Sequence, residues 1–113
     1  MEAVQLDVFK SAAARDSGMK RATDHADSVN AGWSDEAYKL LKQFVKDQYG
    51  EFQAEDLRSY AALIDFPLPP HNRAWGSIMV RGARAGIIKR VGYAPVKNVR
   101  AHRANATVWI KSI

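Results

Sequence analysis

Apolar residues recur with helical spacing in the middle of the chain. They occupy positions i, i+3, i+4, i+7 and i+8, which are Ala37, Leu40, Leu41, Phe44 and Val45. This is the pattern of one face of an amphipathic helix. Ser34 is a suitable N-cap, and Asp35 and Glu36 follow it where the helix dipole favours negative charge. Because Gly50 then ends the pattern, the sequence predicts a helix over residues 34–49.

Two further helices follow. The first begins near Ala54 and is ended by the proline-rich segment 65–70, because proline lacks an N–H and pushes its predecessor out of the α region. The second covers about residues 71–85, with Gly86 in the position of a C-terminal cap. Residues 51–53, between the first two helices, are too few for a helix and are predicted to form a one-bridge strand.

The last third of the chain has strand character. Residues 87–93 alternate between apolar and polar positions, and residues 107–110 are β-branched and aromatic. The connection between them, residues 94–105, is long, polar and basic, which is typical of a wing. We expect the hairpin to close a core with the helices through Val91, Tyr93, Val108 and Ile110.

The first 33 residues have weaker patterns. Residues 9–14 indicate a short helix that is interrupted near Ser17 and Gly18, and residues 19–29 indicate a second helical piece. We therefore divide the chain into an N-terminal helical extension, residues 1–33, and a domain, residues 34–113. The pattern leaves open whether the extension packs on the domain, binds a host or phage protein, supplies a homodimer interface or stays loose.

The predicted order is helix, short strand, helix, helix, strand, basic loop, strand. This is a mainly helical α+β fold with the element order of a winged helix-turn-helix, a three-helix core with a C-terminal β-hairpin wing. In that architecture the third helix enters the DNA major groove, and the wing contacts the backbone or the minor groove.

Four stretches of the chain carry a resemblance to known proteins. They are FQAEDLR at 52–58, PPHNRAWG at 69–76, RAGIIKRVGY at 84–93 and VW at 108–109. Together they resemble small winged-helix proteins of bacteriophage and prophage genomes, over roughly residues 34–111. Residues 14–19 (ARDSGM) also resemble an extension found in front of such domains. The resemblance implies DNA binding by similarity of fold, in a phage or prophage regulatory or replication-associated protein.

The charge of the chain changes sharply along its length. Up to Asp56 there are seven Lys and Arg and eleven acidic residues, and after it there are ten Lys and Arg and one acid, Asp65. Eight of those ten lie between Arg73 and Arg103. A basic half of this kind is the electrostatic pattern of a nucleic-acid binder.

The predicted DNA-reading helix has two different faces. At 100° per residue, Arg73, Ser77, Val80 and Arg84 form one exposed stripe, and Trp75 lies on the opposite, apolar face. A stripe with arginine and a small hydroxyl suits a major groove. The predicted DNA-binding residues, including those of the wing, are Asn72, Arg73, Ser77, Arg81, Arg84, Lys89, Arg90, Lys97, Arg100, His102 and Arg103.

Composition excludes several classes of chemistry. The 113 residues include no cysteine, which removes disulfides, zinc–thiolate sites, iron–sulfur clusters and a thiol nucleophile. No apolar run approaches the roughly 18–20 residues of a membrane span, and the N-terminus lacks the order of a signal peptide. We therefore expect a protein of the host-cell cytoplasm with no membrane partner.

The titratable residues do not form a recognisable catalytic site. His25, His71 and His102 lie in separate segments without metal-ligand spacing. We expect no metal, no cofactor and no enzymatic activity.

Two alternatives to duplex-DNA binding stay open. The first is a winged-helix interaction module that binds a host replication, recombination or transcription protein. The second, RNA or single-stranded DNA binding, is disfavoured because the chain lacks a dense aromatic platform.

Overall fold

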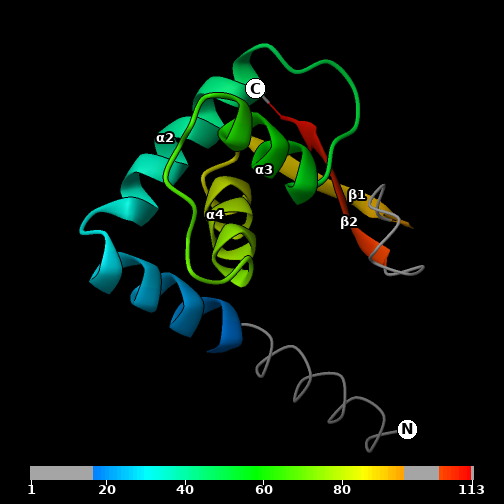
Figure 1. The fold of residues 1–113 in the computed structure, drawn as a ribbon. Coiled ribbons are helices and arrows are strands. Elements are labelled where there is room, and N and C mark those ends of the chain that lie inside the picture. The colour runs from blue at the N-terminus through cyan, green and yellow to red at the C-terminus, as the bar shows by residue number, and fades with distance from the viewer. Residues whose placement is uncertain (1–16, 96–104, 113) are drawn as a thin grey trace, which may run out of the picture.

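The computed structural model describes residues 17–95 and 105–112 (Figure 1). This part of the chain is α+β and mainly helical, as predicted. A helical segment, residues 17–29, precedes the labelled elements. These are α2 (Trp33–Lys46), α3 (Ala54–Leu63), α4 (Arg73–Arg84), β1 (Ile88–Pro95) and β2 (Asn105–Lys111). The bounds of the predicted helices and strands agree with the structure to within three residues.

The two strands form an antiparallel hairpin, and a third segment touches it at one point. Phe52 makes an isolated antiparallel bridge with Trp109. The Phe52 N–H donates to the Trp109 carbonyl at 3.0 Å, and the Trp109 N–H donates to the Phe52 carbonyl at 2.8 Å. The predicted one-bridge strand at 51–53 is therefore confirmed. The bridge joins the start of α3 to β2.

The core is built around Trp75 on α4, which is completely buried. The Trp33 ring meets it edge-on at a centroid distance of 5.1 Å, and the Phe66 ring lies 6.0 Å away. Trp33 Nε1 also donates to the Pro67 carbonyl at 2.7 Å, which attaches the connection between α3 and α4 to the start of α2. Aromatic pairs of this geometry add stability beyond the area that they bury.

Two glycines shape α4. A Cβ atom on Gly82 would lie 2.7 Å from Leu41 Cδ2, so the glycine allows α2 and α4 to approach closely. Gly86 has φ +79°, and its N–H donates to the Ala83 carbonyl at 3.1 Å. The Ile87 N–H donates to the Gly82 carbonyl at 3.1 Å, which completes a Schellman motif. The predicted C-terminal cap at Gly86 is confirmed.

The predicted core face of the hairpin is wrong for β1. Val91 and Tyr93 are exposed, and Ile88 is buried in their place. Val108 is buried as predicted, whereas Ile110 is only half-buried. A shift of one residue exchanges the two faces of a strand. The pairing of β1 with β2 shifts by one residue between Arg90 and Gly92, so the alternation of side chains in β1 is interrupted at Val91 and the predicted core face through Val91 and Tyr93 does not form.

The predicted N-cap at Ser34 is also wrong. Gly32, with φ +79°, holds the N-cap position, and Ser34 lies inside the first turn of α2. Asp27 provides the cap instead: its Oδ1 accepts from the Ser34 N–H and its Oδ2 from the Ser34 hydroxyl, both at 2.8 Å. A side chain of the preceding helical segment therefore accepts hydrogen bonds from the first turn of α2.

The helical segment 17–29 packs on the helices that follow it. Ala26 is buried in the core cluster, and Asp27 makes the cap on α2. Ser17 and Gly18 are helical, so the predicted interruption at these two residues is wrong. The predicted short helix at 9–14 lies outside the described residues.

We expect Asp27→Ala to lower the free energy of unfolding by about 1 kcal/mol, because the substitution removes the cap on α2. Urea denaturation followed by far-UV circular dichroism measures this. Asp24→Ala is the matched control: Asp24 lies on the same helical segment, is exposed and pairs with Lys20 only. Its cost should stay below about 0.5 kcal/mol. Equal costs for the two variants would contradict the capping role of Asp27.

We expect Gly82→Ala to destabilise the protein by about 1 kcal/mol or more. Glycine to alanine inside a helix normally stabilises by about 1 kcal/mol, but here the new methyl group meets the fully buried Leu41 side chain. Gly76→Ala is the control, because its methyl group meets only the end of the half-buried Met19 side chain. Thermal denaturation compares them. A Gly82→Ala variant that melts above the wild type would show that the contact with Leu41 is loose.

Candidate nucleic-acid interface

The outward side of α4 carries the stripe that the sequence predicted. Arg73 and Arg84 are exposed, and Ser77 and Val80 between them are half-buried. Burial of Trp75 and its neighbours on the opposite side of the helix produces this arrangement. α4 has no acidic residue in its first turn, whereas α2 and α3 each have two. Its outward face therefore carries only positive charge.

A cleft lies between α4 and the hairpin. It has a volume of about 370 Å³. Its lining residues are Val80, Ala83, Arg84, Ile88, Lys89, Arg90 and Trp109. We call it the basic cleft, because Arg84, Lys89 and Arg90 are its charged residues. Arg84 belongs both to the exposed stripe of α4 and to the basic cleft. The basic cleft therefore extends the outward face of α4 onto β1.

Arg90 is positioned by aromatic rings. Its guanidinium carbon lies 5.6 Å from the centre of the Trp109 ring and 5.9 Å from that of Tyr93. Arg90 and Trp109 are paired across the two strands. Such cation–π contacts hold an exposed guanidinium in a defined place. The position of Trp109 beside Arg90 could be recognised only with the strand register known.

Arg81 lies apart from the other arginines of α4. Its Nη1 atom is 2.9 Å from Asp35 Oδ1. Its guanidinium carbon is 4.1 Å from the centre of the Tyr38 ring, and Lys42 Nζ is 4.9 Å from the same ring. Arg81 is thus engaged with α2. The sequence grouped it with Arg73 and Arg84, because the partner on α2 is 46 residues away in the chain.

The start of α4 is held by a local hydrogen bond. Asn72 is the N-cap residue and makes no capping bond with its side chain. Instead, His71 Nδ1 accepts from the Arg73 N–H at 3.1 Å. His71 therefore has the capping role, and Asn72 stays exposed beside Arg73.

The remaining predicted DNA-binding residues belong to the wing. Lys97, Arg100, His102 and Arg103 lie outside the described residues. Within the described residues, Arg84 on α4 lines one cleft with Lys89 and Arg90 on β1. Asn72 and Arg73 lie at the other end of α4, beside the helical segment 17–29, and Ser77 lies between the two ends. No acidic residue occurs anywhere after Asp65, so nothing in that part of the sequence opposes this positive charge.

Residues 17–95 and 105–112 contain no cluster of three His, Asp or Glu side chains able to hold a metal ion. In the same residues, no helix has the length and apolar character that crossing a membrane requires. Comparison of the chain with protein-family models, with curated proteins and with solved structures finds no match in any of the three. The function must therefore be argued from the geometry and the charge of this surface.

Proposed function

We propose that this chain is a non-enzymatic winged-helix protein that binds duplex DNA through the outward face of α4 and the basic cleft. One observation carries the proposal. Arg84 on α4 lines one cleft with Lys89 and Arg90 on β1, and the exposed stripe of α4 runs from Arg84 to Arg73, in a region of sequence without acids. Affinity for the DNA backbone depends on positive charges of this kind.

The arrangement of elements supports a winged helix. The chain passes from α2 through the single bridge of Phe52 to α3 and α4, and then into the β1–β2 hairpin. In that architecture the third helix lies in the major groove, here α4, and the hairpin lies beside it. The phage or prophage origin and the regulatory or replication role follow from the resemblance, and we propose them on that basis. We propose a place in the host cytoplasm together with them.

The side chains of the interface suit different parts of the duplex. Arg73 and Arg84 have the forked guanidinium that binds guanine edges in two places. Ser77 can bond to several bases, and Val80 offers an apolar contact for a thymine methyl group. We assign Lys89 and Arg90, which line the basic cleft, to phosphate contacts, which position the protein without reading sequence.

A second candidate function is that of a protein-interaction module, and one observation favours it. Leu63, Ile64 and Leu68 are exposed at the end of α3 and in the loop after it. Neighbouring exposed apolar side chains of this size are typical of contact surfaces between proteins. Two results together would support this function. The chain should capture a host protein in a complex that survives nuclease treatment. The double variant Leu63→Ser/Leu68→Ser should no longer capture that protein, while its binding to duplex DNA stays the same as that of the wild type.

We expect the full chain to bind labelled random duplex DNA with micromolar affinity, because phosphate contacts dominate non-specific binding. Fluorescence anisotropy across a salt series measures this. If five or six cations, including those of the wing, neutralise phosphates, the logarithm of the binding constant should fall with the logarithm of salt at a slope of roughly −5. Single-stranded oligonucleotides should bind more weakly. Absence of duplex binding at low salt would overturn the proposal.

We expect Arg84→Ala to weaken duplex binding and to reduce the salt slope by about 1, because one cation leaves the interface. On a DNA sequence obtained by selection for binding to this protein, the loss of binding free energy should reach about 1–3 kcal/mol if Arg84 contacts a guanine. Arg81→Ala is the matched control on the same helix, and it should cost less because Asp35 and Tyr38 already engage that guanidinium. Equal losses would place Arg81 in the interface and contradict this assignment.

A further inference from the structure

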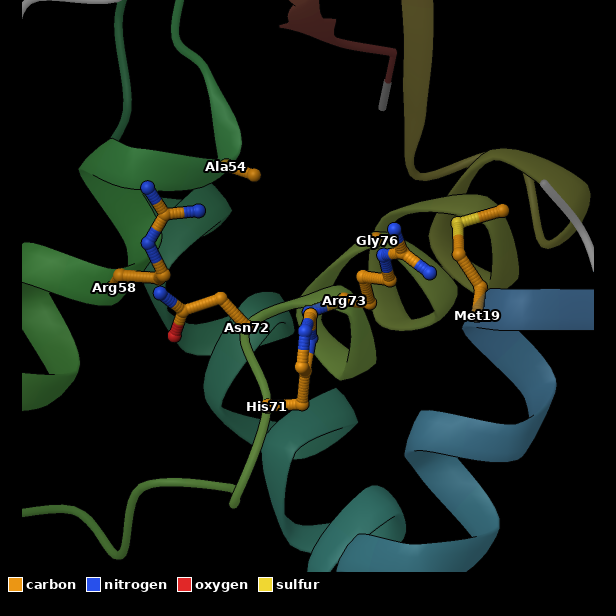
Figure 2. Close-up of a pocket in the computed structure, with 7 residues that line it drawn as sticks. All are labelled: Met19, Ala54, Arg58, His71, Asn72, Arg73 and Gly76. Carbon is orange, nitrogen blue, oxygen red and sulfur yellow. The ribbon is translucent and has the colours of Figure 1, made fainter. Parts of the chain in front are cut away.

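A second and larger cleft lies at the start of α4. It has a volume of about 670 Å³, within the range of small-molecule sites. Figure 2 shows the residues that line it, which are Met19, Ala54, Arg58, His71, Asn72, Arg73 and Gly76. They come from the helical segment 17–29, from α3 and from the start of α4. We call it the three-helix cleft.

One wall of the three-helix cleft is apolar. Met19 lies against Gly76, where an added Cβ atom would be only 2.7 Å from its sulfur. Ala54 adds a methyl group from the first position of α3, on the opposite side of the cleft with Arg58. Since Ala26 and Asp27 attach the segment that carries Met19, this wall is part of the folded protein. It suits the hydrocarbon part of a ligand.

The remaining wall is rich in hydrogen-bond donors. In the view of Figure 2, Arg58 lies on one side and Arg73 lies with Met19 on the other, and Asn72 and His71 are between them. Arg73 Nη1 is 3.2 Å from the position of a Cβ atom on Gly18, so its guanidinium lies against the helical segment. Among the residues that the structure describes, no acidic side chain lines the cleft. The two guanidiniums therefore meet no negative charge among its lining residues.

His71 adds a further donor. Its Nδ1 accepts from the Arg73 N–H, which leaves Nε2 as the ring nitrogen that can donate. Arginine and histidine together offer N–H groups, which match carboxylate, sulfonate and phosphate oxygens.

We propose that the three-helix cleft binds a small amphipathic anion. Its hydrocarbon part packs on Met19, Ala54 and Gly76, and its acidic group lies in the cleft between Arg58 and Arg73, which line it from two sides. A DNA phosphate is a poorer occupant, because it would leave the apolar wall without a partner. Arg73 also belongs to the proposed DNA surface, so we expect the bound anion to weaken duplex binding. This coupling rests on the proposed function, whereas the binding site does not.

Two probes of the same shape test the site. The first is 8-anilinonaphthalene-1-sulfonate, and the second is N-phenyl-1-naphthylamine, which has the same rings without the sulfonate. Fluorescence titration of the full chain should show one site that binds the sulfonate at least tenfold more tightly than the neutral compound. Equal affinity for the two would overturn the proposal, because the arginines would then contribute nothing.

Variants locate the site. Arg58→Gln and Arg73→Gln should each weaken sulfonate binding about tenfold, since each removes a charged hydrogen bond. Arg84→Gln is the matched control, because Arg84 is also an exposed arginine of α4 but does not line this cleft. Far-UV circular dichroism checks that each variant is folded. Unchanged affinity in folded Arg58→Gln and Arg73→Gln would overturn the proposal.

A third measurement separates the site from its effect on DNA. Saturating 8-anilinonaphthalene-1-sulfonate should weaken binding of a labelled duplex to the wild type, but not to Arg73→Gln. Sulfonate binding without any duplex binding would support the cleft and overturn the proposed function. Duplex binding that the bound sulfonate leaves unchanged would overturn the coupling.

Discussion

The burial of Trp75 against Trp33 and Phe66 determines how the rest of the structure is arranged. With this ring completely enclosed, α4 has only one orientation, and Arg73 and Arg84 must lie on its outer side. The close approach at Gly82 holds α4 against α2 in that orientation. The hydrogen bond from Trp33 to the Pro67 carbonyl attaches the proline-rich connection to the same cluster. One aromatic contact thus positions the helix on which both proposed sites depend.

The two ends of α4 have different neighbours, and each end has its own cleft. At the C-terminal end the Schellman motif at Gly86 turns the chain into β1, which places Lys89 and Arg90 beside Arg84. At the N-terminal end the helical segment 17–29 covers Gly76 with Met19. Because α4 carries positive charge along its outer side and has a cleft at each end, a small anion and a larger polyanion can both bind to this one helix. Arg73 is the residue that the two proposals share.

Local patterns predicted much of the fold because their causes are local. Periodic apolar positions, prolines and Gly86 specified where helices begin and end, and the exposed stripe with Arg73 and Arg84 followed from helical geometry alone. Several of the failures involve partners that are distant in sequence or in register. Ser34 is capped by Asp27 of the preceding helical segment, and Arg81 pairs with Asp35 on α2. The faces of β1 depend on a register shift between Arg90 and Gly92, which exists only in the pairing with β2.

The sequence by itself determined the helices and strands, their order, and the separation of acidic and basic halves. These properties depend on neighbours within a few residues or on composition, so they can be recognised in one chain. Only the tertiary structure decided which face of β1 is buried, which arginines lie together and that a cleft forms beside Met19. Those features depend on contacts between segments far apart in the sequence, such as Met19 with Gly76 and Phe52 with Trp109. Their geometry exists only after the helices have packed around Trp75.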